Sequence, residues 1–246
     1  MNTVSGIASL VGASATAETN SYPVAIWLVP AQNQQPQLQE IITYLSKKYS
    51  TEDLRIPTFL PHATLCGGNL NKSLLATELP RLLGNVDNFC ATQKEVWLES
   101  KTARPIDHRD RQEYADTNNK GWATFLYAAL EPNDEALRLF SRAGAHFPSF
   151  KVKKDPDDAH QRLLLPHISL MYCYPTKFSE IERRGIETMM STKVLGQFLF
   201  DAIQVVSPHS GRWEDILSTN PSTNRSWDVV YTKKLGIATS PTTSLI

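Results

Sequence analysis

The stretch Leu164-Leu165-Pro166-His167-Ile168-Ser169-Leu170-Met171-Tyr172 has a near copy about a hundred residues earlier, Phe59-Leu60-Pro61-His62-Ala63-Thr64-Leu65. Each copy reads apolar residue, proline, histidine, apolar residue, serine or threonine, leucine. The alternation of apolar and polar residues predicts a half-buried strand in each copy. Successive side chains on a strand point to opposite faces, so the histidine and the hydroxyl residue of each copy share one face, roughly 6–7 Å apart.

The repetition of the pattern matters more than either copy. A single histidine on a strand is more often a hydrogen-bonded structural residue than a catalyst, and two core strands that each carry a histidine are the alternative interpretation. Two copies instead predict two related lobes that each contribute one strand to a shared cleft. The predicted catalytic residues are His62 and His167, and Thr64 and Ser169 are predicted to bind substrate.

Two opposed imidazoles can act together as a general acid and a general base. An imidazole has an unperturbed pKa of about 6.5, so at neutral pH one ring can be neutral while the other is protonated. The neutral ring can take a proton from water and the charged ring can protonate a leaving oxygen, as displacement at phosphorus requires. The hydroxyls can hydrogen-bond the non-bridging phosphate oxygens. Neither motif has metal-ligand spacing, so we predict no metal and no cofactor.

The paired motifs resemble those of the 2H phosphoesterase superfamily, which is named for two such histidines. Three further segments are similar to the cyclic phosphodiesterases of fungi and plants. Ala25-Ile26-Trp27-Leu28-Val29-Pro30 resembles the opening strand of that branch, Tyr172 matches its Ser-Leu-x-Tyr ending, and Trp227-Asp228-Val229-Val230 resembles its last strand. The resemblance covers roughly residues 22 to 233.

This resemblance implies a fold and a reaction. The fold is α+β and bilobal, with two antiparallel sheets that face a central cleft and helices on their outer faces. The implied reaction is metal-independent hydrolysis of 2',3'-cyclic nucleotides to nucleoside 2'-phosphates. ADP-ribose 1'',2''-cyclic phosphate, a by-product of tRNA splicing, is a second implied substrate and would give ADP-ribose 1''-phosphate. By analogy His167 activates water and His62 protonates the leaving oxygen; the nearly symmetric sequence leaves this order open.

Two aromatic residues are candidates for stacking on the base or the ribose, Trp27 and Tyr172. Tyr172 lies five residues after His167, so on a regular strand it would face the opposite side. It reaches the cleft only if the strand ends or bulges there. Packing in the core is the alternative for both residues.

Composition limits the partners. The 25 basic and 25 acidic residues balance, so no broad basic face for DNA or long RNA is expected, and the predicted partner is a small cyclic phosphate nucleotide bound to a monomer.

The sequence contains three cysteines, Cys66, Cys90 and Cys173. Their number is odd and their spacing is not that of metal ligands, so they predict free thiols in a reducing compartment. The sequence has no stretch of 18 or more apolar residues, so no membrane span is predicted. The expected compartment is the cytoplasm, and the fungal resemblance adds the Golgi apparatus.

About eight strands and four helices are expected, in one domain over residues 21–235 between tails at 1–20 and 236–246. The first histidine strand should cover residues 60–67 and stop at Gly67-Gly68, and residues 149–160 should form a loop that is either a lid or a surface connection. Further expected elements are a helix at 71–83, a strand at Phe89–Glu99, a polar loop at 102–119 and a polar insertion at 208–226.

Two rival functions stay open. The first is another enzyme of the same superfamily that processes RNA ends, either a 3'-to-5' exonuclease or a 2'-5' RNA ligase type. The second is a nucleotide-binding module without turnover, although such a module would not need both histidines and both hydroxyls.

Overall fold

Eight strands and four α-helices lie in the part of the chain that the computed structural model describes, residues 20–52, 56–105, 123–152, 166–173, 178–208 and 227–236. These numbers and the antiparallel pairing of all described strands confirm the predicted α+β class. Residues 1–19 and 237–246, most of the two predicted tails, lie outside the described residues. The elements are β1 (Ser21–Pro30), α1 (Gln35–Tyr49), β2 (Ala63–Asn71), the 3-10 turn η1 (Lys72–Leu74), α2 (Leu75–Thr92), β3 (Val96–Pro105), β4 (Ala123–Glu131), α4 (Asp134–His146), β5 (Lys151–Val152), β6 (His167–Cys173), α5 (Glu180–Ser191), β7 (Gly196–Pro208) and β8 (Trp227–Lys234).

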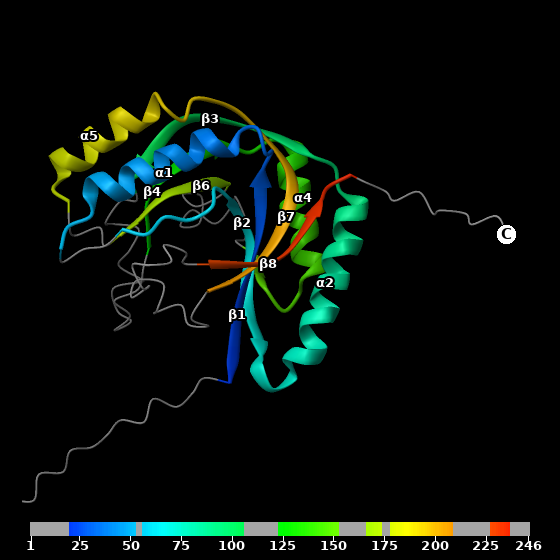
Figure 1. Cartoon of the computed structure of the whole chain (residues 1–246). Helices are drawn as coiled ribbons and strands as arrows, with labels where there is room; N and C mark the ends of the chain where they lie inside the picture. The colour runs from blue at the N-terminus through cyan, green and yellow to red at the C-terminus, as the bar shows by residue number, and fades with distance from the viewer. Residues whose placement is uncertain are drawn as a thin grey trace, which may run out of the picture.

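The two expected sheets are two arms of one hydrogen-bonded sheet, with strand order β5-β2-β1-β7-β3-β4-β6 and β8 paired to β7 (Figure 1). The long strand β7 joins the arms, because its first five residues pair with β3 and its later residues lie between β1 and β8. We call β1, β2, β5 and β8 the first half and β3, β4 and β6 the second half. Strands β2 and β6 belong to opposite halves yet contact each other, so the sheet curls back and brings the two histidine strands together.

All four helices pack on the sheet. Helix α2 contacts β2, β7 and β8, and α4 contacts β2, β5 and also β3, whereas α1 packs on β6 and α5 on β3. Figure 1 shows α1 beside α5 and, on the other side of the molecule, α2 with α4. Helix α1 therefore follows a strand of the first half but covers the second, so the lobes do not coincide with sequence halves. No helix in the described ranges has the length and apolar character needed to span a membrane.

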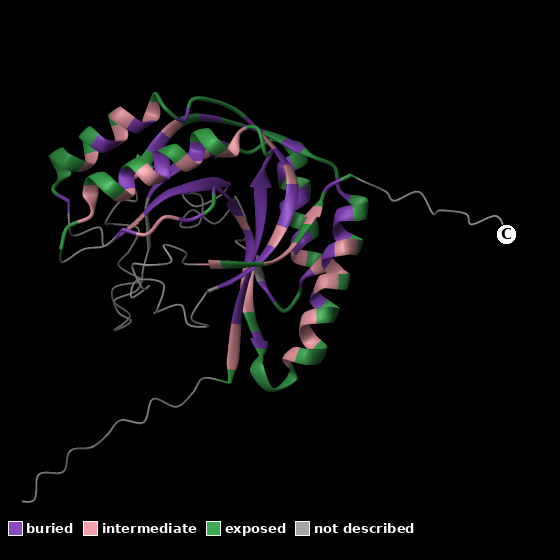
Figure 2. Cartoon of the chain, viewed as in Figure 1, coloured by how far each residue is buried: buried purple, intermediate pink, exposed green. Residues whose placement is uncertain are grey.

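The two faces of β1 enter different apolar clusters, as its alternation predicts. Val24, Ile26 and Leu28 join the main core, which includes residues of all four helices. The opposite face carries Ala25, Trp27 and Val29, which pack with Ala202 and Val206 of β7. Figure 2 shows the buried residues concentrated on the strands, with the exposed ones on the outer sides of the helices. We call the side of the sheet that carries Trp27 the inner face.

A bulge interrupts each histidine strand directly after its hydroxyl residue. In β2, Thr64 pairs with Trp27 and Cys66 with Ile26, so Leu65 has no opposite residue. In β6, Ser169 pairs with Tyr127 and Met171 with Leu126, so Leu170 is the extra residue. Two consecutive residues at each bulge are buried in the main core, Leu65 with Cys66 and Leu170 with Met171.

Helix α2 is longer than predicted and replaces part of an expected strand. The helix does not end at residue 83 but continues to Thr92, and β3 begins only at Val96, so the strand prediction Phe89–Glu99 is wrong over its first half. Gly84 lies inside the helix with open space beside it. Apolar burial outweighs the helix-weakening effect of one glycine. The buried residues follow helical spacing to the end of the helix: Leu82, Val86, Phe89 and Cys90.

Strand β2 continues through the two glycines at which we expected it to stop. Gly67 and Gly68 pair with β1, and a Cβ atom on Gly68 would meet the Phe150 ring at 3.0 Å. The missing side chain thus lets the ring pack against the strand. Next to Phe150, β5 pairs with β2 at the start of the expected 149–160 loop, which is therefore a short edge strand there. Residues 153–160 lie outside the described part.

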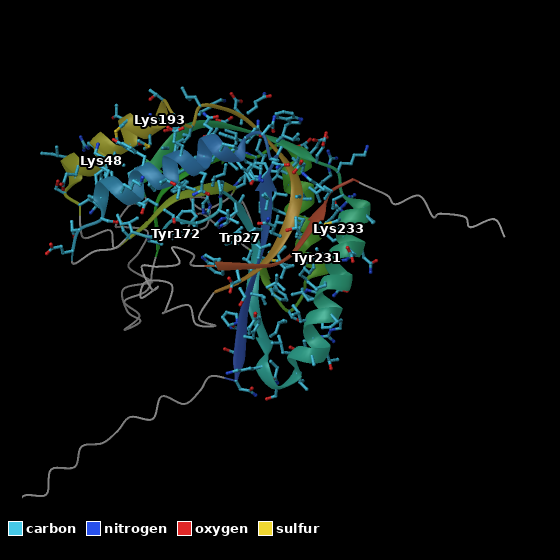
Figure 3. All side chains as sticks on the ribbon, viewed as in Figure 1. Trp27, Lys48, Tyr172, Lys193, Tyr231 and Lys233 are labelled. Carbon is cyan, nitrogen blue, oxygen red and sulfur yellow. The ribbon has the colours of Figure 1, made fainter. Side chains whose placement is uncertain are left out.

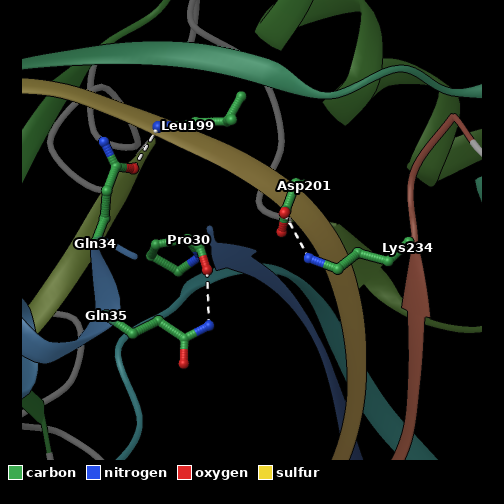
Figure 4. Close-up of polar contacts among 6 residues, drawn as sticks. All are labelled: Pro30, Gln34, Gln35, Leu199, Asp201 and Lys234. Atoms are coloured by element: carbon green, nitrogen blue, oxygen red, sulfur yellow. Dashed lines mark hydrogen bonds and ion pairs between the residues drawn. The ribbon is translucent and has the colours of Figure 1, made fainter. Parts of the chain in front are cut away.

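Polar contacts fix the end of β1 and the start of α1 on β7 (Figure 4). The Gln34 side chain accepts a hydrogen bond from the Leu199 amide at 2.8 Å, and Gln35 Nε2 donates to the Pro30 carbonyl at 2.8 Å. Asp201 and Lys234 form an ion pair that ties β7 to β8. Side-chain caps begin two of the helices, Asn133 at α4 and the Ser179–Glu182 capping box at α5. The Gln34, Gln35 and Asp201 contacts connect the end of β1, the start of α1 and strand β8 to one another through β7.

Candidate active site

His62 lies directly before β2 and is almost fully buried, with 2% of its surface exposed. Its Nδ1 atom lies 2.6 Å from the Leu60 carbonyl oxygen. A carbonyl can only accept a hydrogen bond, so Nδ1 carries a proton and donates it. The other nitrogen, Nε2, is therefore the atom that can exchange a proton with a substrate.

Trp27 of β1 supports the His62 ring from one side. The two rings are stacked, with centroids 3.5 Å apart and an interplanar angle of 6°. Trp227 of β8 meets Trp27 edge-on at 5.2 Å. Trp27 itself is only 1% exposed, so it packs as a core residue while it contacts a predicted catalytic residue. Thr64 lies opposite Trp27 in the β1–β2 pairing and is half-buried on the same inner face.

His167 is the first residue of β6, with Ser169 two positions further along the strand. Both side chains are buried, His167 with 4% of its surface exposed. The ring of Tyr127, from the neighbouring strand β4, makes an edge contact with the His167 ring, with centroids 5.2 Å apart at 64°. Tyr127 lies opposite Ser169, as Trp27 lies opposite Thr64.

The bulge in β6 decides the direction of Tyr172. A regular strand would turn Tyr172 away from Ser169, but the extra residue Leu170 shifts the alternation by one position. Accordingly the Tyr172 hydroxyl donates a hydrogen bond to Ser169 Oγ at 3.0 Å. The condition under which we expected Tyr172 to share the face of the second motif, a bulge in the strand, is therefore met.

Phe59 connects the two motifs. Its ring meets the His62 ring at 5.9 Å and the Tyr172 ring at 4.7 Å, both edge-on. A continuous series of contacts therefore runs from Trp27 through His62, Phe59 and Tyr172 to Ser169. Figure 3 shows the labelled Tyr172 and Trp27 in the same region of the molecule. The contacts thus connect His62 of the first motif with Ser169 of the second. Thr64 lies on β2, which His62 immediately precedes, and His167 lies on β6 with Ser169.

Two of these contacting residues were not predicted from the sequence, Phe59 and Tyr127. Phe59 opens the first copy of the repeated stretch, and this position was noted only as apolar. Tyr127 could have been found by extending the repeat to the partner strands. Ile26-Trp27-Leu28 precedes the first motif and Leu126-Tyr127-Ala128 precedes the second, each with one aromatic residue between apolar neighbours.

Other nucleophiles and ligands contribute little to this region. All three cysteines are buried thiols, and Cys66 lies in the main core rather than on the face of Thr64, as the bulge requires. Burial raises the pKa of both Cys66 and Cys90 to about 12, so neither is a thiolate at neutral pH. Within the described ranges, no three His, Cys, Asp or Glu residues are grouped so that they could hold a metal ion.

Some of the predicted segments cannot be compared with the structure. Residues 106–119 of the expected polar loop, residues 153–160 of the expected lid and residues 209–226 of the expected insertion lie outside the described residues. The described site therefore consists of β1, β2, β4, β6, β7 and β8, together with the segment that leads into β2.

Comparison with known proteins places this chain in a family. The model of the family described as "Cyclic phosphodiesterase-like protein" matches residues 22–230. No curated protein matches significantly. Among solved structures, the chain is similar to TT0787 of Thermus thermophilus, with 12% identity over 87% of this chain and 98% of that one and a TM-score of 0.47.

It is also similar to E. coli LigT complexed with phosphate, with 11% identity over 88% of this chain and 99% of that one and a TM-score of 0.47. LigT complexed with NADP+ has 10% identity over 88% and 99% and a TM-score of 0.48. The family match extends over nearly all of the described residues and includes both histidine motifs. The chain therefore belongs to the cyclic phosphodiesterase-like family of 2H phosphoesterases.

Proposed function

We propose that this chain hydrolyses 2',3'-cyclic nucleotides to nucleoside 2'-phosphates, without a metal, by general acid and base catalysis at two histidines. Membership of the cyclic phosphodiesterase-like family supports phosphodiesterase chemistry. One observation supports the rest of the proposal: ring contacts and a hydrogen bond run from His62 of the first motif through Phe59 and Tyr172 to Ser169 of the second. A binding module would need only one histidine and hydroxyl pair to hold a phosphate.

In the proposed reaction, neutral His167 takes a proton from a water molecule as its oxygen attacks phosphorus. The bond between phosphorus and the 3' oxygen breaks, and His62 Nε2 gives its proton to that oxygen. The phosphate stays on the 2' oxygen. His62 ends neutral and His167 protonated, so proton exchange with solvent restores the starting state. Ring strain in the cyclic phosphate lowers the barrier, and the buried imidazoles are positioned before the substrate binds.

The hydroxyls of Thr64 and Ser169 hold the non-bridging phosphate oxygens in this proposal. Tyr172 donates its own proton to Ser169 Oγ, so that oxygen acts as an acceptor toward Tyr172 and its hydroxyl proton is directed elsewhere. Ser169 is thereby oriented as a hydrogen-bond donor to phosphate. Tyr172 acts through Ser169 in this arrangement and Trp27 acts through His62, so both are positioning residues. Tyr172 is also a candidate ribose or base contact, whereas the buried Trp27 is not.

The resemblance to fungal and plant cyclic phosphodiesterases extends the proposal to ADP-ribose 1'',2''-cyclic phosphate, with ADP-ribose 1''-phosphate as the product. That compound has the same five-membered cyclic phosphodiester on a ribose. The same two proton transfers would therefore open it. A small cyclic phosphate nucleotide bound to a monomer is the partner we propose for both reactions.

The test is hydrolysis of adenosine 2',3'-cyclic phosphate in EDTA with the product isomers separated. We expect release of the 2'-phosphate, and a decrease in kcat of about 10²- to 10⁴-fold for His62→Ala and for His167→Ala. His146→Ala is the matched control, because His146 packs against Phe89 and Phe147 at the end of α4, away from the site. Full activity in either site variant contradicts the two-histidine mechanism.

Two other outcomes would replace the proposal. If the wild-type protein binds nucleotides without turnover, it is a binding module. If it trims or joins RNA ends and leaves the cyclic nucleotide intact, it is an RNA-end processing enzyme of the same superfamily. Running RNA oligonucleotides with 2',3'-cyclic phosphate ends beside the mononucleotide separates these outcomes.

A further inference from the structure

Gln204 on β7 carries a buried oxygen that nothing in the described chain satisfies. Its Oε1 atom is inaccessible to solvent and accepts no hydrogen bond, while the residue as a whole is half-buried. A buried acceptor without a donor destabilises the folded state, so native proteins keep such groups rarely and often for function. Gln204 therefore requires an explanation.

The position of Gln204 in the sheet connects it with the candidate active site. Gln204 pairs with Trp27 across the β1–β7 boundary, just as Thr64 pairs with Trp27 across the β1–β2 boundary. Directly opposed residues on neighbouring antiparallel strands share a face. Gln204 also alternates with Ala202 and Val206, which pack with Trp27 on the inner face. Thr64, Trp27 and Gln204 therefore form one row across three strands.

The other two buried oxygens without a donor in the described chain have different surroundings. Ser100 alternates with Val96 and Leu98, so it lies on the face of β3 that is buried in the main core. Asp201 has its second carboxylate oxygen paired with Lys234. Of the three, Gln204 is the one on the inner face beside the proposed phosphate subsite.

The row also sets the distance between Gln204 and Thr64. Neighbouring strands lie about 4.8 Å apart, so Gln204 lies roughly 10 Å from Thr64 along the inner face. In a nucleoside 2',3'-cyclic phosphate, both ribose hydroxyls next to the phosphate are consumed by the ring. Two kinds of donor remain, the 5'-hydroxyl and the edge of the base, and of these the base edge extends further from the phosphate. A glutamine amide is suited to a base edge because it offers one acceptor and one donor side by side.

We propose that Gln204 is a specificity-determining residue that binds the base of the substrate. Because the side chain as a whole is half-buried, rotation of its amide on substrate binding exposes Oε1, which then accepts a hydrogen bond from an exocyclic amine, the donor that projects furthest from the edges of adenine and cytosine. Uracil has no such amine, so the site prefers adenosine and cytidine 2',3'-cyclic phosphates to the uridine compound. This inference rests on the proposed function, because Thr64 must mark the phosphate position.

The test compares Gln204→Leu with wild type on three substrates: adenosine 2',3'-cyclic phosphate, uridine 2',3'-cyclic phosphate and the base-free 1-O-methylribose 2,3-cyclic phosphate. One neutral hydrogen bond changes binding by roughly three- to tenfold, so we expect KM for the adenosine compound to rise by that factor with kcat nearly unchanged. The base-free compound should show no change, and the preference for adenosine over uridine should disappear.

Two controls keep the result interpretable. Gln197→Leu changes the same residue type on the same strand at an exposed position opposite Glu99, and it should alter none of the three reactions. Gln204→Glu keeps an acceptor at the site and should keep the preference for adenosine. The melting temperature of Gln204→Leu should be unchanged or higher, because the substitution removes an unsatisfied buried acceptor.

Equal losses on all three substrates, or a lowered melting temperature with no change in base preference, would assign Gln204 a structural role and overturn the inference. If wild type hydrolyses none of the substrates, the proposed reaction fails, and direct titration with adenosine 2'-phosphate, uridine 2'-phosphate and ribose 5-phosphate decides the question of Gln204. Tighter binding of the adenosine compound by wild type, lost in Gln204→Leu, supports base recognition; equal binding by both proteins overturns it.

Discussion

The two halves of the sheet share one plan and differ in how each supports its histidine. In both, the hydroxyl residue lies opposite an aromatic residue of the partner strand, Thr64 opposite Trp27 and Ser169 opposite Tyr127, and a bulge follows at once. In the first half the aromatic ring is stacked flat on the imidazole at 3.5 Å. In the second half it meets the imidazole edge-on at 5.2 Å.

This difference gives a physical reason for unequal roles. Burial disfavours a charged imidazole, but both rings are almost equally buried, so burial does not distinguish them. The flat stack of Trp27 on His62 does distinguish the two imidazoles, because the face of an indole ring attracts a cation. The Leu60 carbonyl that accepts the Nδ1 proton of His62 also favours the charged ring. Both contacts support the proposed assignment of His62 as the proton donor and His167 as the base.

The largest expected effect tests these roles with a leaving group that needs no protonation. A phosphodiester of p-nitrophenol releases a stable phenolate, so a general acid contributes little to its cleavage. On this substrate His62→Ala should regain most of its lost activity relative to wild type. His167→Ala should stay about 10²- to 10⁴-fold impaired, because water must still be activated.

The measurement is kcat/KM of both variants on the aryl diester and on the cyclic nucleotide. Rescue of His167→Ala in place of His62→Ala would exchange the two roles while the two-histidine mechanism stands. Rescue of neither would mean that each histidine is needed for more than proton transfer.

A smaller effect is expected from the aromatic partners. Trp27→Leu removes the flat stack that holds the His62 ring, so kcat/KM should fall by about tenfold as the proton donor loses its fixed orientation. Tyr127→Leu is the counterpart in the second half; it removes only an edge contact with His167 and should lower kcat/KM less. Values of kcat/KM for both variants against wild type provide the comparison.

Because Trp27 is fully buried, its replacement also destabilises the protein, by about 2–4 kcal/mol for a large-to-small change in the core. Activity should therefore be measured well below the melting temperature of each variant. Equal losses of kcat/KM in both variants would remove the distinction between the two halves.

The sequence predicted what local patterns encode. The repeated motif and the approximate numbers of strands and helices follow from spacing and side-chain type. These features depend on a few neighbouring residues. The same reasoning identified both histidine and hydroxyl pairs, which the fold then brings to one region.

Features that depend on contacts between residues distant in the sequence were not predicted. Leu65-Cys66 and Leu170-Met171 are apolar pairs, and an apolar pair is compatible with either a regular strand or a bulge, so nothing local showed that the alternation shifts there. The direction of Tyr172 depends on that shift. The pairing of Tyr127 with Ser169 and of Gln204 with Trp27 is set by the register of the assembled sheet, which a single sequence does not display.

The smallest expected effect concerns the contacts that join β8 to α2 in the first half. The Tyr231 hydroxyl of β8 donates to Asp87 of α2 at 2.6 Å, and Lys233 lies 2.9 Å from the same carboxylate oxygen. Figure 3 labels Tyr231 and Lys233 next to each other, apart from Trp27 and Tyr172. Their contacts tie the edge strand β8, which carries Trp227, to the helix layer. They should therefore influence stability and leave the chemistry unchanged.

The stability that the Asp87 contacts contribute depends on pH with a definite sign. The hydrogen bond from Tyr231 and then the Lys233 contact lower the pKa of Asp87, so its contribution to stability is present above about pH 4 and is lost as the pH falls through the lowered value. The hydrogen bond to Asp87 raises the pKa of Tyr231, so the corresponding contribution is present below about pH 10 and is lost above the raised value. Asp87→Asn should thus lower the stability near pH 7 by less than about 1 kcal/mol, as for an exposed pair, with kcat unchanged. Melting temperatures of wild type and variant should converge in acid; a constant difference down to about pH 2, below the range where Asp87 titrates, would mean that packing of β8, and not the charge on Asp87, fastens the first half.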